Sequence, residues 1–390
     1  MNSGGGGQAC SLPPHPRLAK EIIVRITKIT AYGQNQPFRD GAYTCSGGRS
    51  ALGFDSTIMR IDSDAGLTGW GEMAPLGSFY DPSFAAGARV ALAELAPALI
   101  GADPLQTIAL NRRMDHVLKG HPYAKSAIDM ACWDLVGKNA EQPLAEMLGG
   151  RFGETVALYR SVPQAEPARM AEQARKYVEA GYNRIQVKVG LDPDEDVARI
   201  EAVRDALPRD VVLFADANSG WNTHQARRFL RATRTLDYYL EQPCERYDEN
   251  LALRADCDRP LILDESIDSL AVLMRACADR LADGITIKLA RVGGITKARL
   301  IRDTAVEMGL AVTVEDTGGA EIDTAAMAHM SLSTPEGARL HTVDFHNWVT
   351  VSNASGMPPC KNGKMAAPTA PGLGVTPLEE KFGKPIYVAS

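Results

Sequence analysis

The 390-residue sequence predicts an α/β protein in which a parallel (β/α) barrel follows a smaller α+β domain. Beyond Gly150, short apolar segments alternate with longer helical patterns at a repeat of roughly 25 residues, which is typical of parallel βαβ units. Seven or eight such units close into a barrel. Before Gly150, β-branched segments precede a run of amphipathic helices, and the chain length suits two domains.

The first domain is expected to pair an antiparallel sheet with helices. Strands are predicted at residues 22–31, 54–63 and 66–72. The polar, glycine-rich residues 32–51 predict a mobile loop, and residues 76–83 predict a second loop. Apolar residues at three- and four-residue spacing predict helices at 84–99, 105–118, 124–137 and 143–148.

The barrel elements follow in order. Strands are predicted at 155–159, 184–187, 211–215, 238–240, 261–263, 285–287, 311–314 and near 340–343. Helices are predicted at 167–180, 193–207, 223–235, 269–282, 295–308 and 322–332. The turn-rich segment after Asn353 is expected to pack back on the first domain. The expected division is therefore a disordered tail (1–20), the first domain (21–150), the barrel (151–353) and a C-terminal segment (354–390).

Composition narrows the classes of partner. The net charge of -6 and pI of about 5.7 do not indicate a nucleic-acid-binding surface. Seven scattered cysteines without a CxxC pair are typical of reduced thiols, which predicts a cytoplasmic protein. No apolar run reaches the length of a membrane span, and residues 1–20 lack the apolar core of a signal peptide. A small-molecule substrate is the expected partner.

Charged residues end most of the predicted barrel strands. In barrels of this kind the active site lies at the C-terminal ends of the strands. Successive members of the set lie about one barrel unit apart, so they are expected to converge on one mouth. The set comprises Lys188, Asp216, Glu241, Asp264, Lys288 and Asp316.

Three carboxylates on neighbouring strands, Asp216, Glu241 and Asp264, repel one another unless a cation holds them. Oxygen-only ligands favour Mg²⁺, with Mn²⁺ as the alternative. Lys188 and Lys288 would flank a bound substrate as catalytic groups. A metal and a second ammonium nearby are expected to lower the pKa of each lysine, so that it can act as a base.

Other polar residues near these strand ends have structural alternatives. Asn218 and Asp316 are assigned to substrate binding, but either could instead cap a helix. Glu265 is assigned a supporting role and could pair with a lysine. His121 and His329 are interpreted as structural.

Six motifs together resemble the enolase superfamily, in its muconate lactonizing enzyme subgroup, over roughly residues 22 to 386. They are Gln186-Val-Lys188-Val-Gly190, Asp216-Ala-Asn218, Glu241-Gln-Pro243, Asp264-Glu265-Ser266, Ile287-Lys288 and Gly69-Trp70-Gly71-Glu72. The resemblance implies a modified TIM barrel, (β/α)7β, with an α+β capping domain that the C-terminal segment completes. It also implies a lysine base, a magnesium-stabilised enediolate and a homo-oligomer. Gln186 stands where the family usually has a lysine, and a supporting role is assigned to it.

Within that subgroup the sequence looks most like enzymes that act on proline derivatives, on the basis of loop residues that include Tyr43 and Tyr80 and of residues 120–127 and 368–374. This likeness implies dehydration of cis-3-hydroxy-L-proline to Δ1-pyrroline-2-carboxylate, with 2-epimerase side activity.

The alternative within this group is 2-epimerisation of proline betaine or 4-hydroxyproline betaine. Betaine epimerases carry a tryptophan where this chain has Gly318, and a quaternary ammonium favours an aromatic face. The dehydratase is therefore preferred, with Asp316 and Thr317 near the ring nitrogen. A dipeptide epimerase, a cycloisomerase and a barrel that binds without reacting are further alternatives. Exchange of the α-proton with solvent would separate the enzymes from the binding protein.

Overall fold

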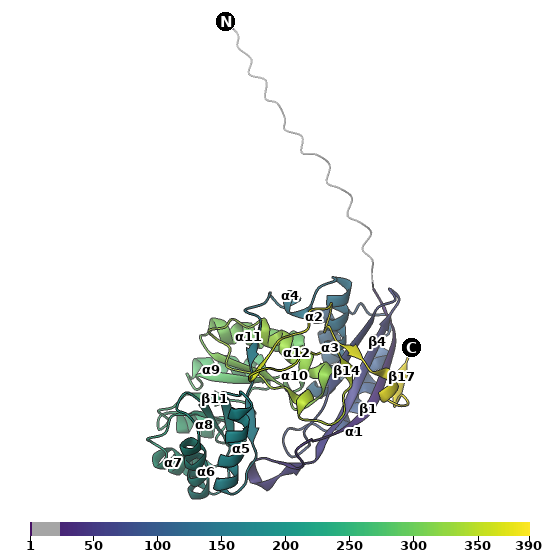
Figure 1. The fold of residues 1–390 in the computed structure, drawn as a ribbon. Helices are drawn as coiled ribbons and strands as arrows, with labels where there is room; N and C mark the ends of the chain where they lie inside the picture. The colour runs from purple at the N-terminus through teal and green to yellow at the C-terminus, as the bar shows by residue number, and fades with distance from the viewer. Residues whose placement is uncertain (2–23) are drawn as a thin grey trace.

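A computed structural model describes Met1 and residues 24–390, and it shows an antiparallel sheet beside a curled parallel sheet (Figure 1). The tail expected at residues 1–20 lies, except for Met1, outside the described residues. The antiparallel sheet has the order β17-β1-β4-β5, and the parallel sheet has the order β13-β12-β11-β10-β9-β8-β7. The predicted α/β class is confirmed. No helix within residues 24–390 is both long and apolar enough to cross a membrane.

The capping domain places its antiparallel sheet against α3. Its strands and helices are β1 (Ile26–Pro37), β4 (Gly53–Ser63), β5 (Thr68–Met73), α1 (Ala85–Leu99), α2 (Thr107–Val117), α3 (Pro122–Asn139) and α4 (Leu144–Met147). A Cβ at Gly69 would lie 2.1 Å from the carbonyl oxygen of Ala131, and one at Gly71 would lie 2.0 Å from that of Ala127. Glycine at both positions therefore allows α3 to lie directly on β5.

The loop predicted at residues 32–51 is partly wrong. Residues 32–37 continue β1, which stays paired with β4 as far as Pro37 and Gly53. Two of the polar side chains there, Gln34 and Gln36, are buried, and Gln36 Nε2 donates to Glu72 Oε1 at 2.7 Å and to Gln34 Oε1 at 3.0 Å. The rest of the segment forms a short hairpin around a 3-10 turn, with β2 (Tyr43–Thr44), η1 (Ser46–Gly48) and β3 (Ser50–Ala51).

The barrel agrees with the predicted alternation, with local differences. Its strands are β7 (Arg160–Val162), β8 (Arg184–Lys188), β9 (Val212–Asp216), β10 (Tyr239–Glu241), β11 (Leu261–Leu263), β12 (Gly284–Lys288) and β13 (Ala311–Glu315). Its helices are α5 (Pro167–Glu179), α6 (Pro193–Ala206), α7 (Thr223–Ala232), α8 (Tyr247–Arg254), α9 (Leu270–Ala278), α10 (Leu289–Val292), α11 (Ile295–Glu307) and α12 (Glu321–Leu332). The sequence did not predict α8 and α10.

Both ends of the parallel sheet differ from the prediction. The strand expected at 155–159 is only partly a barrel strand. Its first half, β6 (Val156–Ala157), pairs antiparallel with β15 (Lys364–Met365), whereas Leu158 forms a parallel bridge with Thr342. The strand expected near 340–343 is an irregular segment. It still closes the barrel, since Leu340 N donates to Val312 O at 2.9 Å and Thr342 N donates to Ala157 O at 3.0 Å.

The C-terminal segment returns to the capping domain, as the sequence predicts. Its last strand, β17 (Tyr387–Ala389), pairs antiparallel with β1 and adds an edge strand to the sheet. Figure 1 shows the C-terminus beside β1. A shorter pair, β14 (Ala354–Ser355) with β16 (Thr376–Pro377), turns the chain on the way. Strands from both ends of the range 24–390 therefore lie side by side in the capping sheet.

His329 on α12 ties α4 to the C-terminal segment. The buried ring accepts from the backbone N–H of Ala145 at Nδ1 (3.1 Å), so Nε2 carries the proton and donates to Leu373 O (3.1 Å). This interpretation as a structural histidine agrees with the sequence analysis. A second proton on Nδ1 would face the N–H of Ala145, and burial lowers the pKa of His329 from 6.5 to about 4.

Acidification is therefore expected to destabilise the fold through His329. The folded pKa lies below the unfolded one, so the contribution is present above pH 6.5 and is lost as the pH falls toward 4. Between pH 7 and pH 5 the free energy of unfolding should fall by about 2 kcal/mol from this residue alone. Urea unfolding at a series of pH values measures it. The variant His329→Gln should flatten the slope, whereas His116→Gln, at an exposed position, should not.

Candidate active site

Strand register brings the predicted strand-end residues into one row. Lys188 is the register partner of Asp216, and Asp216 is the partner of Glu241, across β8, β9 and β10. On the other side of the sheet, Lys288 of β12 is the partner of Glu315 of β13. Partners in register project to the same face, so these side chains meet at the C-terminal ends of the strands.

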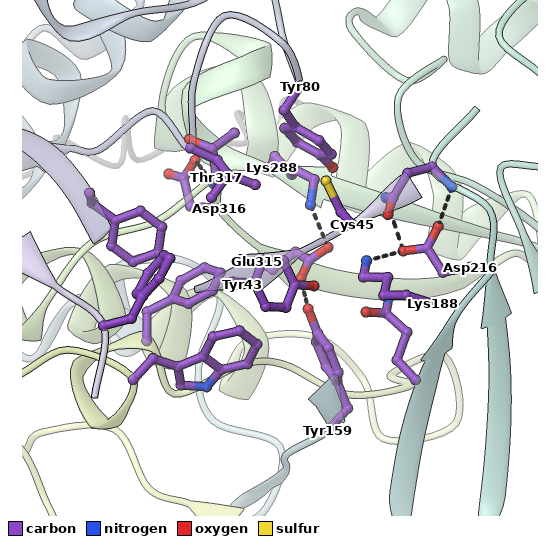
Figure 2. A pocket seen from close by; sticks show the side chains of 17 residues that line it. Tyr43, Cys45, Tyr80, Tyr159, Lys188, Asp216, Lys288, Glu315, Asp316 and Thr317 are labelled. Carbon is purple, nitrogen blue, oxygen red and sulfur yellow. Dashed lines mark hydrogen bonds and ion pairs between the residues drawn. The ribbon is translucent and has the colours of Figure 1, made fainter. Parts of the chain in front are cut away.

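These strand ends surround a pocket under the loops of the capping domain (Figure 2). Nine predicted site residues line it: Tyr43, Tyr80, Gln186, Lys188, Asp216, Asn218, Lys288, Asp316 and Thr317. Three others contact residues of the wall: Glu241 accepts from Gln186, Asp264 from Tyr80, and Glu265 from Asn218. The structure thus brings all predicted site residues together.

Each lysine is held by carboxylates. Lys188 Nζ contacts Asp216 Oδ2, and Lys288 Nζ lies 2.8 Å from Glu315 Oε1 (Figure 2). Lys288 Nζ also lies 3.3 Å from Asp264 Oδ2. Burial lowers the pKa of both lysines, but these carboxylates outweigh it, and the pKa of each is raised. In the structure each ammonium faces carboxylates, and the expected lowering, which depends on a bound metal, stays a prediction.

A buried carboxylate cluster lies between the lysines. Glu241, Asp264 and Glu315 each offer an oxygen, and these oxygens lie within 4.8 Å of one another. Burial and the charges of Asp216, Asp264 and Glu315 raise the pKa of Glu241 well above its usual range. Crowded carboxylates without water need a compensating cation, and their hard oxygen atoms fit Mg²⁺. The sequence had placed Asp216 in this cluster instead of Glu315.

The sequence analysis gave Glu315 no role. It ends β13, one residue before Asp316, and alternation along a strand turns the two side chains to different sides. Tyr159 OH donates to Glu315 Oε2 at 2.5 Å, while Glu315 Oε1 holds Lys288. Tyr159 also went unnoticed, although it is the last residue of the strand that the sequence predicted at 155–159.

Arg291, also missed, links Asp264 to a capping loop. Its guanidinium donates to Asp264 Oδ1 at 2.6 Å and to Asp81 Oδ1 at 3.0 Å, and all three residues are buried. Tyr80 OH donates to Asp264 Oδ2 at 2.8 Å, and its ring centroid lies 5.2 Å from Lys288 Nζ. Burial alone would raise the pKa of Asp264, but the positive charges of Arg291 and Lys288 outweigh it and lower this pKa to about 2. Arg291 lies three residues after Lys288, in the short helix α10, which the sequence did not predict.

The predicted supporting residues contact the carboxylates. Gln186 Nε2 donates to Glu241 Oε2 at 2.9 Å. Asn218 donates from Nδ2 to Asp216 at 3.0 Å and to Glu265 Oε1 at 3.1 Å. Glu265 therefore pairs with an amide and not with a lysine, and burial next to Asp264 and Asp216 raises the pKa of Glu265 to about 8.

Asp316 makes the cap contacts that the sequence analysis offered as its alternative role. Both of its oxygens accept from the backbone N–H of Ala290 at 3.0 Å, and Oδ1 also accepts from that of Thr317 at 2.7 Å. Thr317 Oγ1 donates to Ala74 O at 3.1 Å. Both residues still line the pocket, so substrate binding by them stays a prediction.

The opposite wall of the pocket is aromatic. Phe38, Phe54, Phe345 and Trp348 line it together with Tyr43, whose OH lies 2.9 Å from Ser161 Oγ. The rings meet edge-on or tilted, with centroids 4.8 Å apart for Phe38 and Phe54 and 5.6 Å apart for Tyr43 and Trp348. The pocket therefore has a charged side at the strand ends and an apolar side from the loops.

Known proteins resemble the whole chain. The profile of enolase C-terminal domain-like proteins matches residues 169–381, and that of the mandelate racemase / muconate lactonizing enzyme N-terminal domain matches residues 52–149. A cis-3-hydroxy-L-proline dehydratase from Roseibium aggregatum is 45% identical over 363 residues, which are 93% of this chain and 99% of the relative. An N-succinyl-L-Arg/Lys racemase from Bacillus cereus is 31% identical and covers 80% of this chain and 85% of its own.

A solved structure has the same fold. It is a member of the enolase superfamily from Roseovarius nubinhibens ISM, complexed with magnesium. It aligns with a TM-score of 0.89 and 36% identity, over 94% of this chain and 100% of the other.

Proposed function

Because the chain belongs to the enolase superfamily, in its mandelate racemase / muconate lactonizing enzyme group, we propose that it is a magnesium-dependent dehydratase of cis-3-hydroxy-L-proline. One observation carries the proposal: Lys188 and Lys288, from strands four places apart in the sheet, reach the same pocket beside a carboxylate cluster. The likeness to the Roseibium aggregatum dehydratase over almost the whole chain supports this substrate.

The carboxylate cluster is the proposed magnesium site. We propose Asp216, Glu241 and Asp264 as ligands. Glu315 is the alternative to Asp216 as the third ligand, because its oxygen lies within 4.8 Å of those of Glu241 and Asp264. Bound magnesium would supply positive charge that stabilises the substrate carboxylate as its α-proton leaves.

In the proposed reaction one lysine, as the free amine, takes the proton from Cα. The electron pair of that C–H bond moves onto the substrate carboxylate, which becomes an enediolate. This pair then forms the double bond between C2 and C3 as the bond from C3 to oxygen breaks. The other lysine, as the ammonium, donates a proton to the departing hydroxide, and water leaves. The resulting enamine tautomerises to Δ1-pyrroline-2-carboxylate, so the sum is loss of one water. Return of a proton on the opposite face of Cα would give 2-epimerisation as a side reaction.

Proton NMR in D2O with magnesium tests the proposal. cis-3-Hydroxy-L-proline, L-proline, trans-4-hydroxy-L-proline and their betaines would each be incubated with the full chain. Conversion of cis-3-hydroxy-L-proline to the pyrroline product is the expected result. Absence of α-proton exchange in every compound would contradict the assignment to proline derivatives.

A second candidate function is 2-epimerisation of a proline betaine. The aromatic side of the pocket favours it, because Phe38, Phe54 and Trp348 line the pocket and a quaternary ammonium favours an aromatic surrounding. Exchange and inversion confined to the betaines in the same experiment would select it. The expected homo-oligomer is a separate proposal that light scattering of the full chain tests.

A further inference from the structure

Phe54 sits at the centre of the aromatic wall. It comes from β4 of the capping domain and is 1% exposed. Its ring packs edge-on against Phe38, which directly follows β1, with 4.8 Å between the ring centroids. It packs in the same way against Phe345 of η2 (Phe345–Asn347), with 5.5 Å between the centroids. All three rings line the pocket, so segments from both domains interlock on the side opposite the carboxylates.

The Phe54 ring lies directly on the backbone at Gly318. A Cβ at that position would lie 2.4 Å from both Cδ1 and Cε1 of Phe54 and 2.7 Å from Ala74 O. Contacts this short do not occur, so the ring and a side chain at position 318 exclude each other. Gly318 follows Asp316 and Thr317, which line the pocket. The ring is therefore seated on the loop that forms one side of the pocket, and it cannot move away from a ligand on that side.

We propose that Phe54, seated on Gly318, is a specificity-determining residue that restricts the pocket to compact, ring-closed amino acids. It excludes substrates that are extended on the amino group, such as N-acyl amino acids and dipeptides. The inference rests on the proposed function. That function places the Cα of the substrate between the two lysines and the carboxylate of the substrate at the acidic cluster, so the rest of the substrate is directed toward this wall.

Close packing makes the exclusion strict. Phe54 is confined by Phe38, Phe345 and the backbone of Gly318, so an extended substrate must displace a buried, interlocked ring. A proline ring is more compact than such substrates, since its side chain closes on its own nitrogen. The B. cereus relative is named for N-succinylated arginine and lysine, which extend from both the amino group and the side chain.

The test compares two probes in D2O with magnesium, cis-3-hydroxy-L-proline and N-succinyl-L-lysine. We expect the parent chain to prefer the compact probe in kcat/KM, and Phe54→Ala to reduce that preference at least about tenfold through a lower KM for the extended probe. Phe54→Leu should give an intermediate ratio. Phe229→Ala is the matched control, because that ring is fully buried among barrel residues, packs on Trp221 at 4.6 Å and does not line the pocket.

Each outcome has one meaning. An unchanged preference in Phe54→Ala and Phe54→Leu, with the parent active on cis-3-hydroxy-L-proline, would overturn the role of Phe54 alone. An equal change in Phe229→Ala would reduce the effect to general destabilisation and overturn it too. A parent chain that exchanges neither probe would overturn the proposed function, and one that prefers N-succinyl-L-lysine would overturn both.

Discussion

Replacing Lys188 or Lys288 with alanine is expected to lower the turnover of cis-3-hydroxy-L-proline by about 10²–10⁴-fold, the usual contribution of a positioned acid or base. The two alanine variants should lose different steps of the reaction. The variant that lacks the base should lose exchange of the α-proton with solvent. The variant that lacks the acid should still exchange this proton but should not expel the hydroxyl group. One NMR experiment in D2O measures both, as loss of the α-proton signal and as growth of the pyrroline signals.

Arginine variants at the same positions separate proton transfer from charge. Arginine keeps a positive charge next to Asp216 or Glu315 but does not release a proton in proteins. Lys188→Arg and Lys288→Arg should therefore be as inactive as the alanine variants while they retain the ion pairs. If an arginine variant kept the parent turnover, the lysine would have an electrostatic role only. If neither alanine variant lost activity, the proposed pair of proton-transfer groups would be wrong.

The predictable part of the site follows from barrel geometry. Lys188, Asp216, Glu241 and Lys288 each end a strand, and parallel strands in register bring such residues to one edge whatever the helices between them contain. Local pattern sufficed because each position depends only on where its own strand ends. The choice between Glu315 and Asp316 needed the exact last residue of β13, which an apolar run does not define to one residue.

The unpredicted part depends on contacts between distant segments. Arg291 joins Asp264 to Asp81, which lies in a capping loop far away in the sequence. The seat of Phe54 on Gly318 likewise joins the capping domain to the barrel. The buried polar residues Gln34 and Gln36 are a further example, because Gln36 Nε2 donates to both Gln34 and Glu72 inside the sheet. A hydropathy pattern reflects only the types of residue along the chain. The burial of these residues depends instead on partners that only the tertiary fold brings near.

Removal of the divalent metal is expected to stop both α-proton exchange and dehydration. Dialysis against EDTA should abolish exchange, and Mg²⁺ or Mn²⁺ should restore it, because the substrate carboxylate cannot take up a second negative charge unaided. Binding of Mn²⁺, followed by electron paramagnetic resonance without substrate, gives a readout that does not depend on activity. Glu241→Gln should weaken Mn²⁺ binding by more than about 100-fold, beyond the effect typical of an outer partner, because Glu241 belongs to both candidate ligand sets.

Two further variants identify the third ligand. Asp216→Asn should weaken Mn²⁺ binding as strongly as Glu241→Gln if the ligands come from the consecutive strands β9, β10 and β11. Glu315→Gln should then leave the affinity within about tenfold and mainly lower turnover, since both of its oxygens already hold Tyr159 and Lys288. The reverse pattern would make Glu315 the ligand. Asp216 would then serve only to hold Lys188, and the two lysines would differ in kind, one beside the metal site and one paired apart from it.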